Sequence, residues 1–195
     1  MSQVLLAVSG SVAIYKACDL ASRLTQADHR VRVLMTKHAT DLISPQLFEA
    51  VTGEPAFTSE WGRDRKAAMD HIDLARWGDV LLIAPCSADL IARLAHGMAD
   101  DLVTTVALAL PSEKKRYACP AMNPVMLGSP AVQRNLEQMT KDGWRVMTPG
   151  VGNMACGDHG EGRQRYRECP DAEPDEPRIR PEPRDQLGAG FGRRR

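Results

Sequence analysis

The chain has 195 residues, enough for one α/β domain with a tail but not for a second large domain. Lys and Arg together number 25, and so do Asp and Glu, so the formal charge is zero and gives no indication of a nucleic-acid-binding protein. No apolar run approaches the ~18 residues that span a bilayer. The five cysteines lack paired metal-ligand spacing, and the first residues lead straight into a strand-like run, so we expect a reducing cytoplasm.

Apolar runs alternate with segments of helical periodicity along the chain. The expected strands are Val4–Val8, Val31–Met35, Asp79–Pro85, Arg116–Cys119 and Trp144–Met147. The expected helices are Val12–Leu24, Ala39–Ala50 with a break at Pro45, Cys86–Leu94, Leu102–Leu110 and Ser129–Asp142, while Gly53–Asp70 is polar and irregular. This alternation predicts an α/β fold with a doubly wound parallel sheet that helices cover on both faces.

The first expected strand ends at Ser9-Gly10-Ser11, directly before a helix. Backbone N–H groups at such a helix start can bind a phosphate. The turn lacks the GxGxxG dinucleotide pattern, and any strand-to-helix turn favours Gly and Ser, so an ordinary turn remains an open interpretation. The second strand ends at Thr36, whose hydroxyl would lie beside the first turn in a parallel sheet, although a simple polar loop explains Thr36 equally well.

Asn123 lies in the stretch Pro120–Met126, after a strand-like run and before Pro124. A residue that precedes proline is pushed out of the helical region, so Asn123 is expected on a stiff loop at the carboxyl end of a strand. Open α/β sheets bind ligands at that edge, and an Asn side chain can hold a carboxylate or an amide. Taken alone, an ordinary strand-to-helix turn is the simpler interpretation.

Two further residues have side chains suited to proton transfer. His71 precedes a short helical run and could act as an acid or base near neutral pH, although a surface histidine is the simpler interpretation. Cys156 lies in the glycine-rich segment Gly150–Arg163, where an exposed thiol could donate a proton or act as a nucleophile, or could be an accidental surface cysteine. No metal site is expected, because neither Cys156 nor His159 has a partner pair at ligand spacing.

Four stretches occur in an order that resembles the flavin-containing cysteine decarboxylases. They are Gly10–Ala13 with Tyr15 and Lys16, His71–Leu74, Pro120–Asn123, and Ala155–Asp158 with Gly160 and Gly162, and Ala84–Ala92 is similar to the second flavin-binding turn of that family. The resemblance covers about residues 2 to 163, and within the family it points to the branch that acts on 4'-phosphopantothenoylcysteine in coenzyme A biosynthesis. It implies a flavodoxin-like or Rossmann-like fold, FMN as cofactor, and homotrimers or larger assemblies of trimers.

The resemblance also implies roles for individual residues. The FMN phosphate would be held by Gly10, Ser11 and Val12 with Thr36 alongside, and the flavin would be bordered by Ser87, Ala88, Asp89, Leu90 and Ala121. The substrate carboxylate would bind Asn123, and a loop containing Asn153, Met154 and Ala155 would close over the substrate. His71 would be the catalytic histidine, and Cys156 would be the acid that protonates carbon in the reductive step after CO₂ has left.

Two related groups of flavoproteins offer alternative functions. A flavin prenyltransferase shares the fold and the small-residue first turn, but that group lacks the pair of motifs at Pro120–Asn123 and Ala155–Asp158. A non-catalytic regulatory subunit is the other alternative, with the tail as a partner-binding arm.

The composition changes abruptly after Arg163. Residues Gln164–Arg195 are rich in Pro, Arg, Glu and Asp and have too few apolar side chains to offset chain entropy, so we expect a disordered tail after a domain of residues 1–163. Members of the resembled family continue into a helix here, and the bifunctional members into a ligase domain. A frameshifted or truncated reading frame and a divergent native tail are both open explanations.

Overall fold

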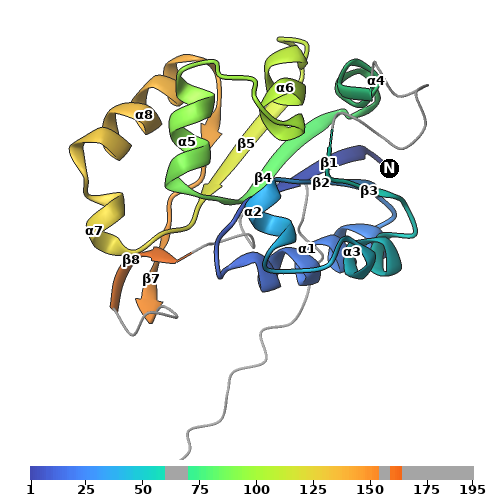
Figure 1. The fold of residues 1–195 in the computed structure, drawn as a ribbon, viewed down its shortest axis with the longest axis horizontal. Helices are drawn as coiled ribbons and strands as arrows, with labels where there is room; N and C mark the ends of the chain where they lie inside the picture. Colours follow the sequence, from blue (N-terminus) through green and yellow to red (C-terminus); the bar gives the residue numbers. More distant parts are fainter. Residues whose placement is uncertain (60–69, 154–158, 164–195) are drawn as a thin grey trace, which may run out of the picture.

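The computed structural model describes residues 1–59, 70–153 and 159–163, which form a layered α/β domain (Figure 1). The elements in chain order are β1 (Gln3–Val8), α1 (Ile14–Gln26), β2 (Arg30–Met35), α2 (Lys37–Thr40), α3 (Pro45–Thr52), β3 (Ala56–Phe57), α4 (Asp70–Trp77), β4 (Val80–Cys86), α5 (Ala88–Ala95), α6 (Leu102–Ala109), β5 (Lys115–Pro120), α7 (Pro124–Leu127), α8 (Pro130–Lys141), β6 (Arg145–Val146), β7 (Gly150–Asn153) and β8 (His159–Arg163).

The main sheet has six parallel strands in the order β3-β2-β1-β4-β5-β6. The edge strands β3 and β6 contain two residues each, so little unpaired backbone is exposed at the sheet edges. Without the short β3, the order β2-β1-β4-β5-β6 is that of flavodoxin-like proteins. The predicted doubly wound parallel sheet is therefore confirmed.

The central strands β1 and β4 are buried on both sides because their residues alternate between two apolar cores. Leu5 and Ile83 belong to the core beneath α4, α5, α6 and α8, whereas Leu6 and Leu82 belong to the core beneath α1, α2 and α3. Successive side chains of a strand point to opposite faces, so a continuous apolar run is what a two-sided sheet requires.

Within the described ranges, no helix is long and apolar enough to cross a bilayer.

The observed elements differ from the predicted ones mainly at their ends and in the glycine-rich segment. Helix α1 begins at Ile14 instead of Val12, and the expected break at Pro45 separates α2 from α3. The segment Gly150–Arg163 was predicted to be a loop, but β7 and β8 pair there as an antiparallel hairpin. Glycine has a low strand propensity, so local sequence gave little indication of this pairing.

The chain leaves β1 in one direction to reach β2, and the later strands β4 and β5 lie on the other side of β1. This reversal makes the carboxyl ends of β1 and β4 the topological switch point of the sheet, where α/β proteins bind ligands. The turns after β1, β2, β4 and β5 all lie at this edge. They contain most of the residues predicted to bind a cofactor or substrate.

Candidate functional site

The first turn of the candidate site is packed closely against the turn that follows β2. A Cβ atom built on Gly10 would lie 2.5 Å from the Cβ atom of His38, so no side chain fits at position 10. Thr36, only 3% exposed, donates its backbone N–H to the Val8 carbonyl at 3.1 Å. The Thr36 hydroxyl accepts the N–H of Ala39 at 3.3 Å. The turns that contain Gly10 and Thr36 therefore lie side by side, with His38 as the residue in contact with Gly10.

Helix α1 begins at this first turn without a side-chain cap. Its N-cap residue is Ala13, and its first turn contains no acidic residue. The positive dipole end of a helix favours a bound anion, and here the N–H groups of Ile14 and Lys16 already donate to the Ser11 and Ala13 carbonyls at 2.9 and 3.0 Å. The start of α1 therefore fits the phosphate of a nucleotide-like cofactor, with Ser11 and the exposed Val12 directly before it.

The second turn follows β4 and begins α5. The hydroxyl of Ser87 accepts the N–H of Leu90 at 3.3 Å and so caps the helix. The Leu90 side chain is fully buried in the core, whereas Asp89 is exposed at the start of α5. In this turn Asp89 is therefore the exposed residue, whereas Ala88 packs partly against the core and Leu90 anchors the helix.

Arg93 compensates the charge of Asp89 and of two further carboxylates. Its guanidinium lies 2.9 Å from Asp89, 3.0 Å from Asp100 and 2.7 Å from Asp101, and its side chain is only 15% exposed. Hydrogen bonding to Arg93 lowers the pKa of Asp100 below its ordinary value. The Asp89 carboxylate is therefore less repulsive toward an anionic ligand in the crevice than an isolated acidic side chain would be.

The third turn, after β5, is joined to the first two. The Ser11 hydroxyl donates to the Ala121 carbonyl at 3.3 Å, and the Ala121 N–H donates to the Cys86 carbonyl at 3.0 Å. The Met122 N–H donates to the Gly162 carbonyl at 3.4 Å, which connects the hairpin β7–β8 to the same turn. Residues from four separate parts of the sequence thus meet at the carboxyl edge of the sheet, where α/β proteins have their ligand-binding crevice.

Asn123 has the extended backbone that the following proline predicted, with φ −71° and ψ 160°. Its side-chain oxygen accepts the Met126 N–H at 2.8 Å and caps the short helix α7. Val125 and Met126 are exposed beside it. Asn123 therefore caps α7 as an ordinary N-cap residue would, and it also lies at the carboxyl edge of the sheet.

His71 is not brought to this crevice by its own chain. It lies in the first turn of α4, a helix that packs against α6 at the opposite end of the sheet from α7 (Figure 1). The predicted Met154, Ala155 and Cys156 lie outside the described residues. The backbone of Asn153 pairs with His159 in the hairpin, and its side chain is not described.

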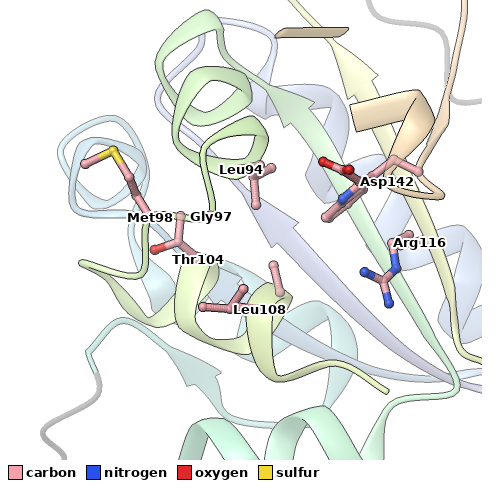
Figure 2. A pocket seen from close by; sticks show the side chains of 9 residues that line it. Leu94, Gly97, Met98, Thr104, Leu108, Arg116 and Asp142 are labelled. Atoms are coloured by element: carbon pink, nitrogen blue, oxygen red, sulfur yellow. The ribbon is translucent and has the colours of Figure 1, made fainter. Parts of the chain in front are cut away.

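A cavity of about 200 Å³ lies elsewhere, between α5, α6 and the end of α8 (Figure 2). Leu94, Met98 and Leu108 line it together with Arg116 and Asp142. The Arg116 guanidinium donates to the carbonyls of Leu110 and Pro111, so its hydrogen bonds hold the protein backbone. Because Arg116 lies near the amino end of β5, this cavity is separate from the crevice at the carboxyl ends. No group of His, Cys, Asp or Glu side chains in the described segments could hold a metal ion.

Sequence reasoning did not assign a specific role to Ser9, which the structure places between the first and second turns. The Ser9 hydroxyl donates to the Pro85 carbonyl at 2.8 Å and accepts the Ser87 N–H at 2.9 Å. Ser9 and Ser87 are 78 residues apart. No local spacing reveals this contact, which follows only from the adjacency of β1 and β4.

Comparisons with known proteins agree with this fold. A probable phosphopantothenoylcysteine decarboxylase of Streptococcus mutans is 42% identical over 160 residues, which are 82% of this chain and 89% of that protein. The coenzyme A biosynthesis bifunctional protein CoaBC of Escherichia coli is 44% identical over 161 residues, 83% of this chain. The match spans 39% of that bifunctional protein, so the chain corresponds to well under half of its length.

Two solved structures are similar over most of the chain. A cysteine-to-serine mutant of PPC decarboxylase complexed with pantothenoylaminoethenethiol has a TM-score of 0.74 at 31% identity and covers 84% of this chain and 91% of its own. The FMN-dependent cysteine decarboxylase SpaF has a TM-score of 0.72 at 33% identity. The match covers 83% of this chain and 90% of the SpaF chain. A family model described as Flavoprotein matches residues 1–168. The chain therefore belongs to the flavoprotein family.

Proposed function

We propose that the chain catalyses the FMN-dependent decarboxylation of 4'-phosphopantothenoylcysteine to 4'-phosphopantetheine in coenzyme A biosynthesis. The observation that carries this proposal is the joining of three strand-to-helix turns at the switch point, one of which starts α1 without a side-chain cap and another of which contains Asn123. The similarity to the Streptococcus mutans protein over most of both chains supports the choice of substrate.

The cofactor would occupy the crevice with its phosphate at the start of α1. Gly10, Ser11 and Val12 would hold the phosphate with Thr36 alongside. The second turn, Ser87 to Leu90, and Ala121 would border the flavin ring. The chemistry that bound FMN supplies is reversible hydride transfer, which creates and later removes the electron sink that a β-thiol carboxylate lacks.

The protein groups would orient the substrate and move protons. The amide of Asn123 would bind the substrate carboxylate, and the segment from Asn153 to Ala155 would cover the bound substrate. Cys156 would protonate carbon after CO₂ has left, since a thiol of pKa about 8.5 is a far stronger acid than a serine hydroxyl. His71 would act in the earlier steps, up to the loss of CO₂.

His71 requires a second chain for this role, because α4 lies far from α7 within one chain. We propose that the protein forms a homotrimer, or a larger assembly of trimers, in which each crevice receives His71 from a neighbouring subunit. A cytoplasmic location suits a substrate whose reacting group is a thiol.

Mass spectrometry of the reaction tests this function directly. Purified protein with bound FMN and phosphopantothenoylcysteine should yield a saturated thiol lighter than the substrate by one CO₂. In Cys156→Ser, CO₂ should be released about once per site, because the oxidised product cannot be protonated efficiently and the flavin stays reduced. In His71→Asn, the release of CO₂ itself should be lost.

Two outcomes would contradict the proposal at different points. Wild-type protein that binds FMN but releases no CO₂ would overturn the decarboxylase function and favour a regulatory flavoprotein. Multiple turnovers to the saturated thiol by Cys156→Ser would leave decarboxylation intact but remove Cys156 from the proton transfer.

A further inference from the structure

Ser9 connects the two central strands at the point where they leave the sheet. Its backbone N–H donates to the Pro85 carbonyl at 3.2 Å, and its hydroxyl donates to the same carbonyl at 2.8 Å. The hydroxyl also accepts the Ser87 N–H at 2.9 Å. Ser9 is 1% exposed, so its hydroxyl both donates and accepts hydrogen bonds inside the protein.

These bonds cross the switch point of the sheet. On one side, the Ser9 carbonyl accepts the Ser11 N–H at 2.9 Å and so shapes the turn that precedes α1. On the other side, Ser87 is the N-cap of α5, and its hydroxyl accepts the Leu90 N–H. The single Ser9 side chain therefore fixes the start of α5 relative to the turn that leads into α1.

We infer that Ser9 is a positioning residue for FMN, which sets the spacing between the phosphate-binding turn and the turn beside the flavin ring. The inference rests on the proposed FMN site. Because the Ser9 hydroxyl is occupied by Pro85 and Ser87, Ser9 acts through the two turns and not by contact with the cofactor. A ligand that contacts both turns binds well only when their separation is preset.

The decisive measurement is the FMN affinity of apoprotein carrying Ser9→Ala, taken from flavin fluorescence at a temperature where the variant is fully folded. Loss of a buried hydrogen bond that preorganises the site should weaken FMN binding about tenfold. Ser9→Thr keeps the hydroxyl and should restore the wild-type affinity. At saturating FMN, the visible circular dichroism of the flavin in Ser9→Ala should differ from that of wild type and of Ser9→Thr.

Thr104→Val is the matched control, because Thr104 is also 1% exposed and its hydroxyl bonds Asp101 at the start of α6, outside the crevice. This control should lower thermal stability without changing FMN affinity or the flavin spectrum. If Ser9→Ala does not fold, Ser9→Cys replaces it, since a thiol is a weak hydrogen-bond donor and acceptor and should also weaken FMN binding.

The outcomes separate this inference from the proposed site. Wild-type protein that binds no FMN would overturn the proposed site itself. If wild type binds FMN and Gly10→Ala weakens that binding, but Ser9→Ala binds with wild-type affinity and an unchanged flavin spectrum, the site stands and the positioning role of Ser9 is wrong.

Discussion

Gly10 is the residue with the least tolerance for a side chain in the first turn. An alanine methyl group there would lie 2.5 Å from the Cβ atom of His38, and the backbone carbon of His38 is only 3.3 Å away. Relief requires the turns after β1 and β2 to separate, and overpacking of this kind costs about 1–3 kcal/mol. Gly10→Ala should therefore lower the free energy of unfolding by that amount in urea denaturation and weaken FMN binding.

Gly128→Ala provides the matched control. Gly128 has φ −72°, which alanine adopts readily, and an added Cβ would lie 3.4 Å from the Pro124 carbonyl oxygen. The free energy of unfolding should be unchanged or higher by about 0.5 kcal/mol. If Gly10→Ala and Gly128→Ala lower the free energy of unfolding equally, the contact with His38 is not what excludes a side chain at position 10.

Single residues were predictable where the constraint is local. The extended conformation of Asn123 follows from Pro124 alone and is confirmed by the structure. The contact of Ser9 with Ser87 depends on which strands are neighbours, so it could not be derived from either turn. The same holds for the contact of Met122 with Gly162, which depends on a hairpin that was not predicted.

At the scale of the elements, helix α6 depends on a cap that also binds Arg93. The Asp101 carboxylate accepts the Thr104 N–H at 2.9 Å, and the Thr104 hydroxyl accepts the Asp101 N–H in return. Asp101→Ala should lower the free energy of unfolding by about 1–2 kcal/mol, because it removes this N-cap as well as an ion pair. Urea denaturation at pH 7 measures the loss.

Asp100→Ala is the control for the ion pair, since Asp100 bonds the same guanidinium but is not the N-cap. Asp100→Ala should lower the free energy of unfolding by less than Asp101→Ala does. Because the pKa of Asp100 is lower in the folded protein, its stabilisation is fully present above the unfolded pKa of about 3.9 and disappears as the pH falls through the folded pKa. If Asp100→Ala lowers the free energy of unfolding as much at pH 2 as at pH 7, the charge of Asp100 is not what stabilises the fold.

Elements with a strong apolar pattern were predicted well, and those without one were not. Strand β4 is a continuous apolar run, as expected for a strand that is buried on both faces. Its position was therefore clear from the sequence. Four of the nine residues in strands β7 and β8 are glycine, and the two strands have no alternating apolar pattern. Its pairing depends on contacts with the rest of the domain, including the one between Met122 and Gly162.

At the scale of the whole molecule, alternation of strands and helices was sufficient to predict a doubly wound sheet. It was not sufficient to predict that β1 and β4 are adjacent, and that adjacency brings the first and second turns together. The same topology leaves α4, with His71, at the far end of the sheet from α7. A chain that folds this way can use His71 and Asn123 in one reaction only if two subunits share each site.

Mixing of two inactive variants tests that shared site. His71→Asn and Asn123→Ala should each be inactive alone. If each site takes His71 from one subunit and Asn123 from its neighbour, as in a heterologous ring, a trimer that contains both variants has one intact site among its three and should regain about a third of the wild-type rate per subunit. The mixture is prepared by coexpression with two affinity tags, and CO₂ release is measured on assemblies that carry both. Mixed assemblies that bind FMN but stay inactive would place both residues' roles within single chains and would overturn the shared site.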